Sequence, residues 1–249
     1  MRAARGAARA ALALCLAGAA AAARAGPADD VLSAVVDDGE REIDLKAGSG
    51  RSRAGAATRQ FTAGYGLGLG HGVFTEAYAL WHQEPGEPRG FDAFEWENRV
   101  QLTETGRHAV DVGVLLEIER PRDRSDGYEV RTGLLLQGDP AARLQANLNL
   151  LFEKHLRSRT PAQATLGYQW QLKWRAAPAF EPGLQGLGEL GPWRRWAAAG
   201  EPSHAAGPAA FGRVKTGPGQ AIRYNAAWLH GFNDGAPRQL LRLQVEYEF

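Results

Sequence analysis

The end of the chain shows the clearest pattern of hydrophobic and polar positions. From Leu241 to Phe249 every second residue is apolar, and the residues between them are charged or polar. A period of two is typical of a β-strand, whose successive side chains point to opposite faces of the sheet. One face of this segment is therefore hydrophobic and the other is polar and charged. The pattern predicts a strand whose two faces meet different environments.

The same alternation recurs along the chain after Gly39. Twelve runs of alternating residues are separated by turn residues. The runs span residues 40–46, 59–68, 72–82, 91–103, 108–119, 127–137, 143–155, 164–174, 179–189, 204–214, 221–231 and 239–249. An even number of antiparallel strands brings both chain ends to one side, as in bacterial outer-membrane barrels. The pattern predicts an all-β protein, a transmembrane antiparallel up-and-down β-barrel of about twelve strands.

The predicted connections between the runs also alternate in length. Those after even-numbered runs are short, at 69–71, 104–107, 138–142, 175–178 and 215–220. Those after odd-numbered runs are mostly longer and richer in proline, glycine and charge, at 47–58, 83–90, 156–161, 190–203 and 232–238. Outer-membrane barrels have short periplasmic turns and longer outside loops. In a soluble β-sandwich, short and long connections are not expected to alternate along the chain in this way.

The final strand resembles the C-terminal strand of Gram-negative outer-membrane β-barrel proteins, in which a terminal phenylalanine and alternate aromatics are read by the assembly machinery. Tyr247 and Phe249 occupy those positions. Three internal segments are similar in order and spacing to a proteobacterial family of porin-like outer-membrane barrels: FEWENR (94–99), ANLNLLFE (146–153) and LQGLGE (184–189). The resemblance implies fold and location, with outer-membrane lipid and the barrel-assembly machinery as partners, and implies no activity. A soluble periplasmic β-protein remains the alternative.

Residues 1–25 have the features of a signal peptide. Three arginines precede a short apolar core at 10–23, and small residues at Ala23 and Ala25 fit a cleavage site that leaves Gly26 as the new terminus. A lipoprotein would use Cys15, but Leu14 stands where a small residue is expected. The protein is therefore predicted to be exported to the outer membrane of a Gram-negative bacterium.

The remaining sequence divides into two parts. Residues 26–39 are acidic and irregular, and we expect a short periplasmic N-terminal tail that is too small to plug a barrel. Residues 40–249 form the predicted barrel. The chain has 29 Lys and Arg against 28 Asp and Glu, which gives no overall basic character for nucleic-acid binding. Cys15 is the single cysteine, so the mature chain has no disulfide framework.

If the apolar faces meet lipid, the charged residues of the runs line the lumen. The predicted lumen-lining residues, which would set selectivity, are Glu95, Glu97, Arg99, Asp111, Glu117, Glu119, Glu129, Arg131, Glu153, Lys173, Glu189, Arg223, Arg242 and Glu246. Lys173 is expected among carboxylates such as Glu153 and Glu189. Run 204–214 is rich in alanine and glycine, and its facing cannot be fixed from the sequence.

Charges in a narrow lumen must be hydrated or paired, which leaves two hypotheses for function. The first is a porin-like channel that passes small polar solutes through a charged, water-filled lumen. The second is a closed structural or binding barrel that acts through its extracellular loops or a partner. Twelve strands lie between the filled eight-stranded barrels and the open sixteen-stranded porins, so size does not decide.

Enzymatic chemistry finds little support in the sequence. Serines lie only in the tail or in predicted loops, and no Gly-x-Ser-x-Gly motif occurs. The carboxylate pairs Glu95/Glu97 and Glu117/Glu119 have the spacing that any lumen-facing residues of one strand have. The six histidines show no metal-ligand spacing. We therefore predict no catalytic residues, no metal site and no cofactor, with an outer-membrane enzyme as the least favoured alternative.

Overall fold

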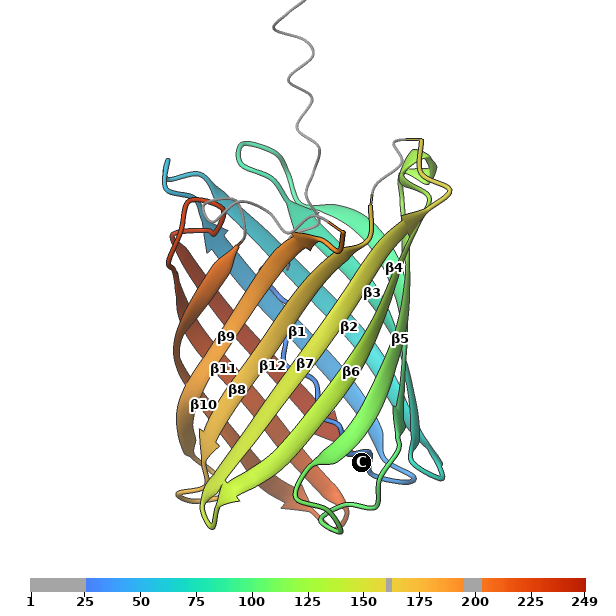
Figure 1. Ribbon diagram of the computed structural model, residues 1–249, viewed down its shortest axis with the longest axis vertical. Coiled ribbons are helices and arrows are strands. Elements are labelled where there is room, and N and C mark those ends of the chain that lie inside the picture. The colour runs from blue at the N-terminus through green and yellow to red at the C-terminus, as the bar shows by residue number, and fades with distance from the viewer. Residues whose placement is uncertain (1–25, 160–162, 195–202) are drawn as a thin grey trace, which may run out of the picture.

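The computed structural model describes residues 26–159, 163–194 and 203–249. Within these residues the chain folds into twelve antiparallel strands, and β1 pairs with both β2 and β12 to close a barrel (Figure 1). The strands are β1 (Arg41–Arg51), β2 (Ala57–Gly70), β3 (Val73–Gln83), β4 (Gly90–Gln101), β5 (Asp111–Pro121), β6 (Tyr128–Ala141), β7 (Leu144–Leu156), β8 (Thr165–Trp174), β9 (Glu181–Pro192), β10 (His204–Gly217), β11 (Gln220–Gly231) and β12 (Gln239–Glu248). The predicted fold class is confirmed. The predicted signal peptide and its cleavage after Ala25 lie outside the described residues.

Helical structure in the described part of the chain is limited to one 3-10 turn, η1 (Arg124–Asp126). The carboxylate of Asp123 caps this turn by accepting a hydrogen bond from the N–H of Ser125. No helix among residues 26–159, 163–194 and 203–249 is long and apolar enough to cross a membrane.

The strands agree with the alternating runs, and their ends differ by at most four residues except in the first run. There β1 continues from the predicted end at 46 to Arg51. The added residues pair on both sides, with Gly48 opposite Gln60 of β2 and Arg242 of β12. Alanine, glycine and serine occupy most of this half of β1, so no hydrophobic alternation marks it.

The connections separate into two ends of the barrel. The turn end holds the connections after even-numbered strands and the carboxyl terminus, and the loop end holds the others (Figure 1). Three turn-end connections are as short as predicted, at 71–72, 142–143 and 218–219. The connection from β4 to β5 is longer than predicted, at 102–110. Asp111 and Thr103 order it by accepting hydrogen bonds from the N–H groups of Gly106 and Val112.

Exposure follows the alternation of each strand. In β12 the side chains of Leu241 and Leu243 are 62% and 48% exposed, whereas Arg242 and Gln244 between them are 5% and 9% exposed. Apolar residues on the other strands form the same outward face, which suits contact with acyl chains. In β10, whose facing the sequence left open, Phe211 and the neighbouring alanines of the odd-numbered face are buried in the lumen.

Residues 26–39 differ most from expectation. Instead of forming a free tail, this lumen segment lies inside the barrel, with Ala34 1% exposed (Figure 1). Its start is close to Gln60, near the loop end of β2. At the turn end the N–H of Gly39 donates to the C=O of Gly68. The expectation that the segment is too small to fill the barrel is wrong for these residues.

The outward face gives a first prediction. Replacing Leu243, in the middle of β12, by arginine places a charge against the centre of the bilayer and should destabilise the folded barrel by about 2–4 kcal/mol. The matched control is Leu69→Arg, at the turn end of β2, where an outward arginine should cost at most about 1 kcal/mol because it reaches the headgroups. Denaturant unfolding in lipid vesicles measures both. Equal losses at the two positions would contradict the facing.

Candidate functional site

The lumen has one half dominated by carboxylates. Residues paired across neighbouring strands place their side chains side by side on one face. A continuous row of such pairs crosses β3 to β7: Glu76 opposite Glu97, Glu97 opposite Glu117, Glu117 opposite Arg131, and Arg131 opposite Glu153. Like charges opposite one another are destabilising, so the row depends on the cations that interrupt it.

Arg131 on β6 is the counter-ion of this row. Its guanidinium lies 2.9 Å from a carboxylate oxygen of Glu117, 3.2 Å from Glu129 and 3.2 Å from Glu153. Two groups of side chains have the donor atoms and spacing of a metal site, Glu129/Glu153/His155 and Glu95/Glu97/Glu117. Arg131 contacts members of both groups, so it already supplies positive charge where a cation would bind.

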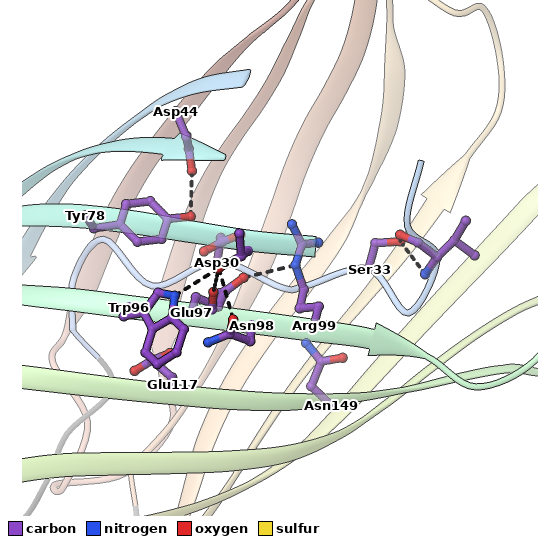
Figure 2. Close-up of polar contacts among 12 residues, drawn as sticks. Asp30, Ser33, Asp44, Tyr78, Trp96, Glu97, Asn98, Arg99, Glu117 and Asn149 are labelled. Atoms are coloured by element: carbon purple, nitrogen blue, oxygen red, sulfur yellow. Dashed lines mark hydrogen bonds and ion pairs between the residues drawn. The ribbon is translucent and has the colours of Figure 1, made fainter. Parts of the chain in front are cut away.

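A second set of contacts surrounds Lys46 on β1. Its ammonium lies 2.8 Å from Asp30 of the lumen segment and 3.3 Å from Asp44, and it donates to the hydroxyl of Tyr78 (3.0 Å). Figure 2 shows Tyr78 in turn donating to Asp44, at 3.3 Å. Burial alone would raise the pKa of Asp30, but the neighbouring Lys46 outweighs it, so the pKa of Asp30 lies below its ordinary value.

Arg99 and Arg223 form further ion pairs nearer the turn end. The Nε of Arg99 lies 3.0 Å from Glu97 (Figure 2), and its guanidinium stacks over the ring of Phe74 at 4.2 Å. Arg223 on β11 forms an ion pair with Glu248 and another, at 3.2 Å, with Asp37 of the lumen segment. The lumen segment is therefore tied by ion pairs to β1 and to β11.

The opposite half of the lumen carries uncharged amides. Five of them join in a hydrogen-bonded row across β6, β7, β8, β9 and β11. Asn147 donates to Gln137 (2.9 Å), Gln171 to Asn147 (3.2 Å), and Gln185 to both Gln171 (3.1 Å) and Asn225 (3.2 Å). Each amide offers donors and acceptors together, so this wall can bind polar groups without selecting by charge.

The lumen segment separates two cavities. The larger has a volume of about 500 Å³ and lies between the segment and the turn-end half of the wall. Its charged lining includes Glu42, Glu76, Arg99, Lys173, Arg223 and Glu246. The smaller, of about 40 Å³, lies on the other side of the segment against Glu95, Glu97 and Glu117. A polar cavity of the larger size has ample room for water and for a small solute.

The structure places all the predicted lumen-lining residues on inward-facing positions of the strands. Glu97, Asp111, Glu117 and Arg242 are buried, and Glu95, Arg99, Glu119, Glu129, Arg131, Glu153, Lys173, Glu189, Arg223 and Glu246 are half-buried. Their role in selectivity stays a prediction. Asp111 serves the connection from β4 to β5 through its hydrogen bond with Gly106, away from the central lumen.

The predicted neighbours of Lys173 are wrong. Lys173 lies near the turn end of β8, whereas Glu153 pairs with Thr165 and Glu189 with Gly167 at the loop end of the same strand. The ammonium of Lys173 instead stands 4.7 Å from the centre of the Phe211 ring. The alternation predicts on which face of the sheet Lys173 lies but not which side chains are its neighbours across the strands.

The C-terminal residues predicted as an assembly signal lie on the outer face of the barrel. The rings of Tyr247 and Phe249 stack with centroids 5.6 Å apart, and Tyr65 of β2 approaches Phe249 at 6.5 Å. Recognition of these rings by the assembly machinery stays a prediction.

Several lumen residues were not among the predicted site. Glu42, Asp44 and Lys46 are buried on β1, and Phe74 and Tyr78 are buried on β3. A second group is apolar: Leu115, Leu135 and Leu151 face inward and pack with Leu32 and Ala34 of the lumen segment. The signal for this group was present, because each of these leucines interrupts the alternation with a second or third consecutive apolar residue.

The Arg131 contacts give a second prediction. Arg131→Met removes the shared counter-ion of three carboxylates and should destabilise the barrel by about 3–5 kcal/mol, since uncompensated buried charge remains. The control is Arg107→Met, which removes an exposed ion pair with Glu104 and should cost at most about 1 kcal/mol. Unfolding free energies of the two variants in the same vesicles measure the difference. If Arg131→Met lowers the free energy of unfolding no more than Arg107→Met does, water and not Arg131 compensates the negative charge of the carboxylate row.

Comparison with known proteins identifies the fold. No protein-family model matches the chain, and no curated protein matches its sequence. Among solved structures, the NanC porin superposes with a TM-score of 0.56 at 10% identity, over 83% of this chain and 98% of that one. The KdgM porin in complex with disordered oligogalacturonate gives 0.52 at 8% identity, over 84% and 98%. The described part of the chain is a closed twelve-stranded antiparallel β-barrel, and this fold is similar to that of the two porins.

Proposed function

We propose that the protein is a porin-like channel for small polar solutes, closed in this structure by the lumen segment. The observation that carries the proposal is the charged cavity of about 500 Å³ beside the segment. A closed bracing interior needs no such space. The segment is held by ion pairs, hydrogen bonds and apolar contacts, and its departure would join this cavity to the smaller one along the barrel. The turn end faces the periplasm in this proposal, as in other outer-membrane barrels.

Fixed charge in the lumen favours cations. The inward-facing acids of the strands include Glu42, Asp44, Glu76, Glu95, Glu97, Asp111, Glu117, Glu119, Glu129, Glu153, Glu181, Glu189, Glu246 and Glu248, and the inward-facing bases near them include Lys46, Arg99, Arg131, Lys173, Arg213, Arg223 and Arg242. Rings of carboxylates select cations in channels because they replace part of the hydration shell. The excess of acids over bases therefore supports a preference for cationic or neutral polar solutes.

The alternative is a closed structural or binding barrel. One observation favours it: the lumen segment packs its apolar side chains against Leu115, Leu135 and Leu151, as a core element does. The two functions differ in what happens when this packing is broken, because only a channel then conducts ions.

The third prediction separates these functions. Leu32→Asp in the full chain places a carboxylate in the apolar contact of Leu115, Leu135 and Leu151, and should release the lumen segment. We expect a several-fold rise of single-channel conductance in planar bilayers over the wild-type chain. The matched control is Val35→Asp, which adds the same carboxylate where the side chain lines the larger, polar cavity. The conductance of the Val35→Asp chain should stay close to that of the wild-type chain. A folded Leu32→Asp barrel that does not conduct would overturn the channel and leave the closed barrel.

The fourth prediction concerns selectivity. Lys173 lines the larger cavity, so Lys173→Gln in the Leu32→Asp background should shift the reversal potential in a salt gradient towards cations. Lys215→Gln is the control, because Lys215 is exposed at the turn end of β10. A reversal potential unchanged by Lys173→Gln, or changed equally by both, would place the ion path away from Lys173.

A further inference from the structure

The barrel wall contacts the main chain of the lumen segment at regular intervals. The side-chain oxygen of Gln60 accepts from the N–H of Ala28 (3.4 Å), and that of Gln101 accepts from the N–H of Val36 (2.9 Å). Midway between them, Asn149 contacts Leu32 twice. With its carboxamide oriented to satisfy both groups, it accepts from the N–H of Leu32 (2.9 Å) and donates to the C=O of Leu32 (3.3 Å).

These contacts suit a peptide and few other ligands. One carboxamide that pairs with the N–H and the C=O of the same residue matches the arrangement of donors and acceptors along an extended chain. An oligosaccharide presents hydroxyl groups instead. The amides come from β2, β4 and β7, so three different strands form hydrogen bonds to the main chain of the segment.

Glycines in the wall make room for the same main chain. A Cβ on Gly48 of β1 would overlap the backbone of Pro27, and one on Gly68 of β2 would overlap the C=O of Asp37. On β5, a Cβ on Gly113 would lie 3.0 Å from the C=O of Ala34. Glycine inside a strand marks close approach of another backbone. Here three strands carry such glycines at three levels along one path.

Side-chain contacts complete the site. Leu32 packs on the inward leucines of β5, β6 and β7, and Asp30 forms its 2.8 Å ion pair with Lys46. Near the amide row, the hydroxyl of Ser33 donates to Gln137 (2.9 Å). A ligand for this path therefore has an extended main chain, a carboxylate and, two residues later, an aliphatic side chain.

We propose that the lumen is a binding site for an extended acidic peptide, which residues 27–37 occupy within the same chain. The inference deepens the proposed function, because it names short peptides as the polar solutes that enter the lumen once the segment leaves. The wall contacts the main chain at three positions and also the side chains of Asp30, Val31, Leu32, Ser33 and Asp37. The site therefore favours peptides whose sequence resembles that of the segment.

The test uses the full-length Leu32→Asp chain and a synthetic, fluorescently labelled peptide of residues 26–37. Fluorescence anisotropy in detergent measures binding, and block of the current in planar bilayers is recorded in parallel. We expect saturable binding and a peptide-dependent block. If the Leu32→Asp chain does not fold, the full-length Asp30→Asn chain, which loses the ion pair with Lys46, is probed with the same peptide.

Recognition of the main chain is tested with proline. A peptide with proline in place of Leu32 and Val36 lacks the two N–H groups that Asn149 and Gln101 bind, and should bind at least tenfold more weakly. The control is the Val35→Pro peptide, because the N–H of Val35 bonds to the Ser33 hydroxyl of the peptide itself. Its affinity should change much less.

The outcomes distinguish the peptide site from the channel. A conducting barrel that does not bind the peptide overturns the peptide site and leaves the channel. Binding without conductance supports the peptide site and overturns the channel. Equal binding of the two proline peptides, or equal block by a neutral oligosaccharide of similar length, overturns main-chain recognition and with it this inference.

Discussion

Charged side chains enclosed by the barrel must each have a counter-ion or water, and this requirement arranges the whole interior. Carboxylates stand side by side on neighbouring strands from β3 to β5, where their repulsion would open the wall. Arg131 and Lys46 each bridge acids from more than one element, and Arg99 pairs with Glu97. The ion pair of Lys46 with Asp30 shows that the lumen segment belongs to the same network, so its position depends on the charges of the wall.

The interior combines two kinds of wall around one extended chain. The acidic half fixes charge, and the amide half offers hydrogen bonds of either sense without charge. The inward leucines between them supply the dry contact that Leu32 needs. These three kinds of contact give the segment a defined position in the lumen. They still allow it to dissociate, because no single contact is as extensive as the pairing of two strands. Occlusion and release of the lumen can therefore coexist in one fold.

Much of the fold follows from the sequence because a period of two is a strong signal when one face meets lipid. The strands, their facing and the inward charges were all predictable on this ground. The second half of β1 was not, since Ala47 to Gly50 have no apolar face to reveal. The neighbours of Lys173 were missed for a different reason. Facing depends on parity alone, whereas neighbours depend on the stagger of the strands, and the sequence locates the turns that set the stagger only to within a few residues.

The position of the lumen segment inside the barrel was not predicted, although the inward-facing residues of the wall are adapted to it. Length and composition suggested a tail, because an irregular acidic stretch has no pattern of its own. The complementary signal lay elsewhere in the chain. Leu115, Leu135 and Leu151 are apolar at positions that should face water, and Gly48, Gly68 and Gly113 lack side chains where the wall should have them. Inward-facing positions that hold leucine or glycine, where polar residues are expected, therefore indicate that a segment occupies the lumen.

The covalent link between the lumen segment and β1 sets how readily the lumen can change its occupant. Gly39 ends the segment and leads directly into Glu40 and β1, so a released segment stays attached to the turn end of the barrel. A short tether of this kind maintains an effective concentration on the order of millimolar. A peptide arriving from solution competes against that concentration and prevails only when it is abundant or binds more tightly. The length of the tether would thus act as a threshold, making the barrel respond to plentiful peptides and ignore scarce ones.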